Sequence, residues 1–163
     1  MTDGGPLRVY LPGDEATLTA LRDTGELSMV DGFAVTEELR SVLPDADDEQ
    51  LEYAALSAAA DASLLLLAAA AEPAHRRIVV AADVESLEEA PDEHVAAVHL
   101  DRPVRLSAVA AIHVDDPADA GLVHAAVEAL PAAILGDPDG RAAVDALADQ
   151  ELSWYATQEL DGL

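Results

Sequence analysis

Residues 113–116, His-Val-Asp-Asp, form the densest group of side chains that could bind a metal or transfer a proton. On a β-strand, His113 and Asp115 would share one face, because side chains alternate between the two faces. An imidazole and two carboxylates suit a hard divalent metal, and His124 could add a second imidazole. The structural alternative is that Asp115 or Asp116, which precede a proline, caps the following helix.

A second candidate is Asp83, at the carboxyl end of the most apolar predicted strand. Open α/β sheets place their sites at such ends, and His99 or Arg102 of a neighbouring strand could be its partner. The alternative is a turn residue that ends the strand. If the protein is an enzyme, Asp83, His99, His113 and Asp115 are its catalytic candidates, and His113, Asp115 and Asp116 are its candidate metal ligands. This hypothesis requires the side chains to converge in one pocket.

Aromatic residues make up only 3% of the chain, so the adjacent Trp154 and Tyr155 stand out. On a helix, neighbours point about 100° apart, so at most one of them faces the core squarely. The other could contact a partner, because tryptophan and tyrosine are enriched at interface hot spots. Tyr53 could place its hydroxyl beside Arg8 or Tyr10. Tyr53, Trp154 and Tyr155 are therefore candidate interface residues, with core packing as the alternative.

Absent residues exclude several chemistries. The 163 residues contain no cysteine and no lysine, which excludes a thiol nucleophile, a cysteine zinc site, a Schiff base and a Walker-A loop. The glycines form neither a dinucleotide fingerprint nor a nucleophile elbow. Acidic repeats at 45–48 and 137–140 lack the later positions of a calcium loop. We therefore expect no cofactor.

The charge of the chain also limits its partners. Acidic residues number 33 and basic residues 8, which gives a formal charge of −25 and argues against nucleic-acid binding. The most apolar run, 54–71, is alanine-rich, carries Asp61 and lacks a basic flank, so we expect no membrane association. The first residues do not resemble a signal peptide, so we expect a cytoplasmic protein.

Helix and strand signals predict a disordered tail at 1–6 and one α+β domain at 7–163. Strands are expected at 7–11, 32–36, 76–84, 95–100 and 110–114. Helices are expected at 14–24, 36–43, 47–71, 118–130 and 141–159, with one further helical turn at Ser107 and a loop at 136–140. The order is β-α-β-α-α-β-β-β-α-α, which predicts a single mixed sheet of about five strands with packed helices.

Three of these expectations concern individual residues. The consecutive apolar residues Ile78, Val79 and Val80 predict a central strand covered on both faces. Asp14 and Thr36 are expected to cap the first two helices, and the carboxylates within 45–49 should stabilise the start of the third through the helix dipole. The long helix should bury one apolar stripe and end near Pro73. The stripe consists of Leu51, Ala55, Ala58, Ala62, Leu65, Leu66 and Ala69.

Several segments together resemble a family of uncharacterised actinobacterial proteins that is defined only as a domain of unknown function. They are Leu7-Arg-Val-Tyr-Leu-Pro12, Ala34-Val-Thr36, Leu51-Glu-Tyr-Ala-Ala-Leu-Ser57, Arg76-Arg-Ile-Val-Val-Ala-Ala-Asp83, Ala111-Ile-His-Val-Asp-Asp116 and Leu152-Ser-Trp-Tyr-Ala-Thr-Gln-Glu159. The resemblance spans nearly the whole chain. It implies a single-domain bacterial cytoplasmic protein, and it assigns no catalytic residue.

Two functional hypotheses remain open. The first is a non-enzymatic protein-interaction or regulatory module that binds a protein partner or forms a homodimer. In its sharper version the acidic surface is a decoy for a basic nucleic-acid-binding surface, although the charge can equally serve solubility. The second is a small-ligand or metal-dependent enzyme that uses the strand-end aspartates and histidines.

Overall fold

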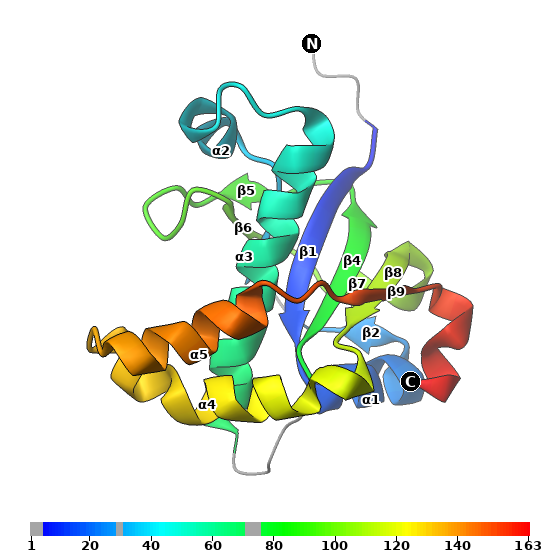
Figure 1. Cartoon of the computed structure of the whole chain (residues 1–163). Helices are drawn as coiled ribbons and strands as arrows, with labels where there is room; N and C mark the ends of the chain where they lie inside the picture. Colours follow the sequence, from blue (N-terminus) through cyan, green and yellow to red (C-terminus); the bar gives the residue numbers. More distant parts are fainter. Residues whose placement is uncertain (1–4, 29–30, 71–75) are drawn as a thin grey trace.

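A computed structural model describes residues 5–28, 31–70 and 76–163 of the chain (Figure 1). The strands are β1 (Leu7–Gly13), β2 (Glu26–Leu27), β3 (Asp31–Phe33), β4 (Ile78–Val84), β5 (Glu88–Glu89), β6 (Ala97–His99), β7 (Val104–Arg105), β8 (Val109–Val114) and β9 (Ser153–Tyr155). The α-helices are α1 (Glu15–Thr24), α2 (Glu37–Val42), α3 (Asp48–Ala69), α4 (Ala120–Ile134) and α5 (Pro138–Ala148). The 3-10 helices are η1 (Leu106–Ala108), η2 (Pro117–Asp119) and η3 (Thr157–Gly162).

The strands form a seven-stranded sheet in the order β5-β6-β3-β1-β4-β8-β9, and β2 and β7 pair separately. The expected combination of helices with one large sheet is confirmed, but the mixed sheet of about five strands is wrong. Every strand pair among the described residues is antiparallel. The missed strands are two or three residues long, too short to show an alternating pattern of their own.

Strand β4 lies inside the sheet, between β1 and β8, and its first five residues are buried. Ile78 and Val80 join one hydrophobic cluster, whereas Val79 and Ala81 join another on the opposite face. This confirms a central strand covered on both faces.

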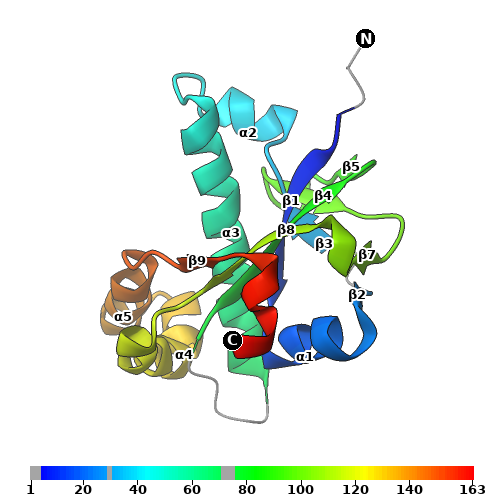
Figure 2. The same ribbon diagram turned by 90° about the vertical axis from the view of Figure 1, so that its right-hand side faces the viewer.

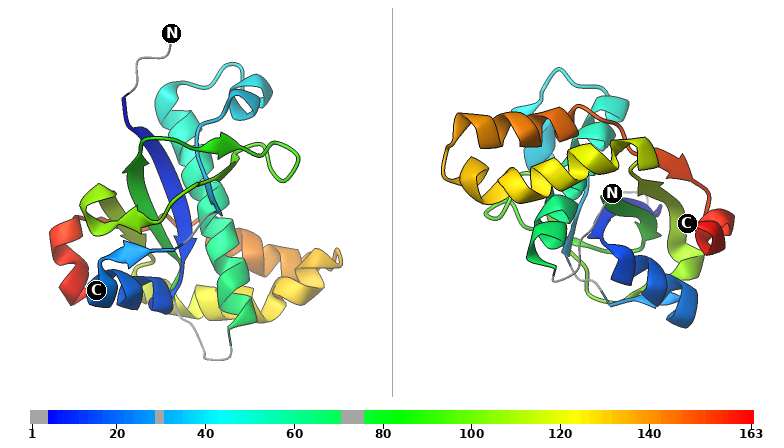
Figure 3. Two further views of the ribbon diagram at one scale, coloured as in Figure 1. Left: turned by 180° about the vertical axis from the view of Figure 1, so that it is seen from behind. Right: turned by 60° about the horizontal axis from the view of Figure 1, so that its bottom comes forward.

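Three layers result (Figure 2). Helix α3 crosses one face of the sheet and buries Leu51 and Ala55 there. Helix α1 and η3 cover the other face through Leu18, Leu21 and Leu160. Helices α4 and α5 pack together and form a third cluster against the carboxyl-terminal half of α3 (Figure 3).

The predicted helix starts are confirmed. Asp14, Thr36 and Asp47 each accept a hydrogen bond from the backbone N–H three residues later, which satisfies a donor that the first turn leaves free. Gly25 ends α1 in the left-handed conformation with φ 69°, a conformation that favours glycine. The expected turn at Ser107 is also present, as η1.

Helix α3 follows the predicted apolar stripe only in part. Leu51 and Ala55 are buried, but Leu65 and Leu66 are exposed. The helix is apolar on nearly all sides, so its pattern cannot select the buried face. Its length and hydropathy would allow a membrane span, although in this structure it contacts β1, β4 and α4. Pro73, its expected end, lies outside the described residues, as do residues 1–4 of the expected tail.

The largest error is the helix expected at 141–159. Helix α5 starts earlier, at Pro138, because Asp137 caps it within the stretch expected to be a loop, and it ends at Ala148. Residues 153–155 instead form β9, paired with β8. Trp154 and Tyr155 therefore lie on opposite faces of a strand and not on neighbouring positions of a helix.

Candidate functional site

The carboxylate of Asp115 is held in a buried ion pair with Arg77. Its two oxygens accept hydrogen bonds from Arg77 Nε at 2.9 Å and Nη2 at 2.8 Å, and from the Arg77 backbone N–H at 2.7 Å. Arg77 is 3% exposed and Asp115 is 1% exposed, and Arg77 Nη2 also donates to the Gln150 carbonyl at 3.2 Å. The pair thus joins the start of β4, the end of β8 and the segment that leads into β9.

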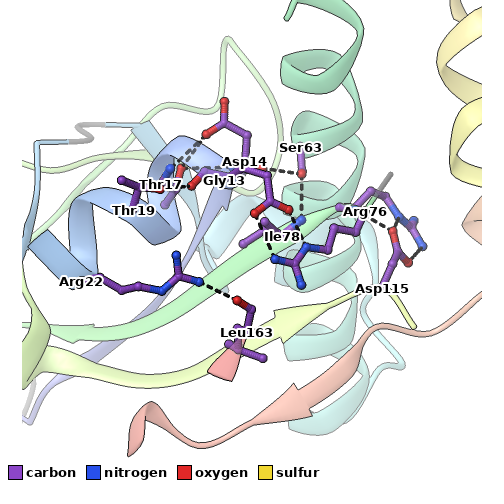
Figure 4. A network of polar contacts seen from close by, with 12 residues as sticks. Gly13, Asp14, Thr17, Thr19, Arg22, Ser63, Arg76, Ile78, Asp115 and Leu163 are labelled. Atoms are coloured by element: carbon purple, nitrogen blue, oxygen red, sulfur yellow. Dashed lines mark hydrogen bonds and ion pairs between the residues drawn. The ribbon is translucent and has the colours of Figure 1, made fainter. Parts of the chain in front are cut away.

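A second polar contact fixes α3 on the same end of the sheet (Figure 4). The buried Ser63 hydroxyl donates to the Gly13 carbonyl at 2.7 Å and accepts from the Ile78 N–H at 3.0 Å. Close by, Arg76 pairs with Glu15 of α1, with 3.0 Å between Nη2 and Oε2. The Ser63 hydroxyl and the Arg76–Glu15 pair at this end of the sheet therefore connect α3 and α1 to the strands.

The side chains proposed as metal ligands have separate roles. Asp115 is engaged by Arg77, and the Asp116 side chain accepts from the Ala118 N–H at 2.8 Å, so it caps η2. Helix capping by Asp116 is confirmed. His124 pairs with Glu128 one turn along α4 at 3.3 Å. Within the described residues, no three histidine, aspartate or glutamate side chains are grouped as a metal site.

Asp83 has a partner other than the two expected. Residues 8 and 83 face each other across β1 and β4, and Arg8 Nε donates to Asp83 Oδ1 at 2.8 Å. Arg102 lines a hollow of about 410 Å³ together with Asp83, but its own contact is Asp101, at 3.5 Å.

His99 lies in β6 and contacts two other carboxylates. Its ring nitrogens lie 2.7 Å from Asp31 and 2.9 Å from Glu93. These contacts, with Asp31 the stronger, raise the pKa of His99 above its ordinary value. The four catalytic candidates therefore occupy different places in the fold, and only Asp83 and His113 are linked, through Arg8.

Another group of the predicted residues does come together. Where the first half of α3 lies beside β1, β8 and β9, the surface has a hollow of about 250 Å³, which we call the α3 hollow. It is lined by Arg8, Tyr10, Glu49, Glu52, Tyr53, Leu56, Ala111, His113 and Trp154. Tyr53 thus lies beside Arg8 and Tyr10, as expected, and Trp154 joins it.

Strand alternation explains this grouping. Trp154 pairs with His113, and His113 with Val79, so these three side chains point to the face that α3 covers. Arg8 and Tyr10 of β1 lie on that face as well, because residues two apart share a face. The α3 residues of the hollow recur at three- and four-residue steps, so they form one helix face.

The charge of the α3 hollow is negative. Arg8 is neutralised by Asp83, whose hydrogen bond raises the pKa of the guanidinium further. In the described part of the chain, Glu49 and Glu52 form no ion pair, although both line the hollow. Burial, and then Glu52, raise the pKa of Tyr10 above its ordinary value, so its hydroxyl stays protonated at neutral pH.

His113 adds no positive charge to the hollow. Burial, and then the positive charge of Arg8, lower the pKa of His113 below its ordinary value. Its imidazole is therefore neutral at neutral pH, since the unperturbed pKa is already about 6.5.

Two large aromatic side chains of the hollow face solvent. Trp154 is 61% exposed and Tyr53 is 53% exposed. Tyr155, on the other face of β9, packs against the core instead. The expectation that one of the two adjacent aromatic residues faces inward and the other outward therefore agrees with the structure. A strand, and not the expected helix, produces this arrangement.

A larger depression continues the hollow towards α2 and β5. Its volume is about 660 Å³, and it shares Arg8, Tyr10 and Glu52 with the α3 hollow. Its other cation, Arg40, lies 3.3 Å from Asp48. Both arginines along this surface are thus paired with carboxylates.

Sequence reasoning missed Arg77, Glu49 and Glu52. Arg77 and Asp115 are 38 positions apart, and no local pattern joins them. The glutamates had a weak signal, since Glu49 lies one helical turn before Tyr53 and Glu52 is its immediate neighbour.

Comparisons with known proteins leave the function open. No curated protein and no solved structure matches the chain. One family model matches residues 7–163, almost the whole chain. The chain belongs to that family, a family of unknown function (DUF6912).

Proposed function

We propose that the protein is a non-enzymatic interaction protein that binds a positively charged segment of a partner protein in the α3 hollow. One observation carries this proposal: the exposed Trp154 and Tyr53 lie together with Glu49 and Glu52, two carboxylates without an ion pair in the described chain.

These side chains suit the end of an arginine or lysine. A guanidinium or ammonium is attracted to the face of tryptophan or tyrosine within about 6 Å of the ring centre. A carboxylate nearby adds a charge-assisted hydrogen bond, which is stronger than one between neutral groups. Arg8 does not oppose the incoming cation fully, because Asp83 neutralises it.

The charge of the whole chain favours the same partner. A protein of formal charge −25 attracts basic surfaces over distances set by the salt, about 8 Å at physiological ionic strength. A second copy of the chain carries the same negative charge and would be repelled. The charge therefore favours a basic partner over a homodimer.

The enzyme hypothesis has less support. It required Asp83, His99, His113 and Asp115 to converge, and these residues lie at separate places. His113 is the one that lines the α3 hollow.

The test is the binding of a short fluorescent peptide in which arginine and valine alternate, measured by anisotropy at physiological salt. We expect saturable binding, and no binding of the same peptide with glutamate in place of arginine. Trp154→Ala and Glu52→Gln should each weaken binding about tenfold, since each removes a cation contact worth about 1–2 kcal/mol.

Matched controls separate a site from general attraction to a polyanion. Leu135→Ala removes an apolar side chain that is 88% exposed outside the hollow, and Asp145→Asn removes an exposed charge of α5. Both controls should bind like the unchanged protein. Equal weakening by Asp145→Asn and Glu52→Gln would contradict the proposal, and so would the absence of saturable binding.

A further inference from the structure

Strand β9 stands at one edge of the seven-stranded sheet, and no further strand of the described chain pairs with it. In the right-hand view of Figure 3 it lies on the outside of β8, between α5 and the carboxyl-terminal η3. An edge strand has unpaired backbone N–H and C=O groups along its outer side, and these can pair with another chain.

The sequence of β9 does little to prevent such pairing. Edge strands are commonly protected by lysine, proline, a bulge or a short length. β9 is short, but Ser153, Trp154 and Tyr155 include neither a charge nor a proline, and its pairing with β8 is regular.

The chain segment that contains β9 carries charge of one sign. Between residues 142 and 163 the chain has no arginine or histidine. Four exposed carboxylates flank the strand in sequence: Asp149, Glu151, Glu159 and Asp161. Glu159 also accepts the Ala156 N–H at 2.8 Å, which fixes the chain where it leaves β9.

We propose that the partner segment binds by strand addition: it extends the sheet beside β9 and places a basic side chain next to Trp154. This inference rests on the proposed function and adds the mode of binding. Neighbouring strands lie about 4.8 Å apart, and side chains directly opposite have Cβ atoms about 4.5–5.5 Å apart. An arginine opposite Trp154 is thereby within the range of a cation–π contact.

The same geometry argues against a second copy of the chain as the added strand. Two β9 strands side by side would bring two sets of the flanking carboxylates together, and like charges across a sheet destabilise pairing. A basic extended segment would instead place opposite charges there.

The test uses two isomers of the arginine–valine peptide, one N-methylated at every arginine and the other at every valine. In an extended chain the N–H groups of alternate residues point to opposite edges, so only one set can reach β9. With the arginines facing Trp154, one isomer should lose binding by more than about tenfold and the other should bind like the parent peptide. Hydrogen exchange of β9 amides should slow when the parent peptide binds.

The outcomes distinguish the two proposals. If the parent peptide binds in a manner that depends on Trp154, but both methylated isomers bind equally well, strand addition is overturned and the proposed function stands. If the parent peptide does not bind, both proposals fail. A stable dimer with β9 amides already protected in the absence of peptide would also overturn strand addition.

Discussion

Two arginine–aspartate pairs lie on the same sheet and differ in what surrounds them. Arg77 and Asp115 are almost fully buried and make three contacts with each other, whereas Arg8 and Asp83 are partly exposed at the edge of a hollow. The first pair joins three segments of the chain, and the second neutralises charge in the candidate site. The comparison shows that burial makes the first pair a structural joint, whereas the second pair stays at the surface, where the proposed site lies.

The largest effect is expected from breaking the buried pair. Asp115→Asn leaves the Arg77 guanidinium buried without its counter-charge, which should cost about 3–5 kcal/mol of unfolding free energy. Urea denaturation measures the loss. Exchanging both residues for apolar side chains of similar size should recover much of it, because no buried charge remains. A loss below about 1 kcal/mol for Asp115→Asn would mean that the pair is not buried as described.

An intermediate effect is expected at Ser63, a buried neutral group at the same end of the sheet. Ser63→Ala removes the acceptor of the Ile78 N–H and the donor to the Gly13 carbonyl. A buried N–H without a partner costs about 1–3 kcal/mol, so the urea midpoint should fall with an unchanged slope. Ser57→Ala, on the same helix and only partly buried, is the control and should change the stability little.

The exposed pair should matter more for binding than for stability. Arg8→Gln should change the unfolding free energy by no more than about 1 kcal/mol, because exposed pairs contribute little. The same variant frees the Asp83 carboxylate, so it should strengthen binding of the arginine–valine peptide several-fold. Weaker peptide binding would contradict this prediction and would show that the Arg8 side chain itself supports the bound peptide.

The smallest effects concern two histidines with opposite pKa shifts. Burial lowers the pKa of His113 in the folded protein, so the unfolded chain gains a proton first as the pH falls. His113 therefore lowers the free energy of unfolding as the pH falls from about 6.5, its ordinary pKa, towards the lower pKa that it has in the folded protein. In His113→Gln, less stability should be lost between neutral and mildly acidic pH.

His99 should behave in the opposite way. Asp31 and Glu93 raise its folded pKa, so its contribution is present below about 6.5 and is lost as the pH rises through the raised value. His99→Gln should therefore reduce stability at mildly acidic pH and leave it unchanged at higher pH. The same pH dependence in both variants would contradict the described surroundings of these residues.

Local signals predicted local structure well. The caps at Asp14 and Thr36 were predictable because each acts within its own turn, and the acidic start of α3 was predictable from the helix dipole. The apolar run 78–80 identified the central strand, since only a strand covered on both faces favours such a run. Tyr53 was suggested as a neighbour of Arg8 or Tyr10, and all three residues line the α3 hollow, but no local pattern required this contact.

The misses come from partners distant in the sequence. β9 is a strand because it pairs with β8, and its three residues alone are equally compatible with a helix. Asp115 was correctly singled out, but its partner Arg77 lies 38 positions away. The hypothesis that Asp115 binds a metal did not include its buried ion pair with Arg77, which already occupies both carboxylate oxygens. α3 is so apolar overall that only contact with the sheet selects its buried face.

Binding of a cationic segment in the α3 hollow should change the surroundings of Trp154, so the fluorescence of this side chain tests the proposed function most directly. Trp154 is the only tryptophan in the chain, so the emission reports on the hollow alone. Titration with the arginine–valine peptide at physiological salt should give a saturable change at one peptide per chain, and Glu52→Gln should shift the midpoint upward. An unchanged emission while the labelled peptide binds would place binding elsewhere and rule out the α3 hollow as the binding site.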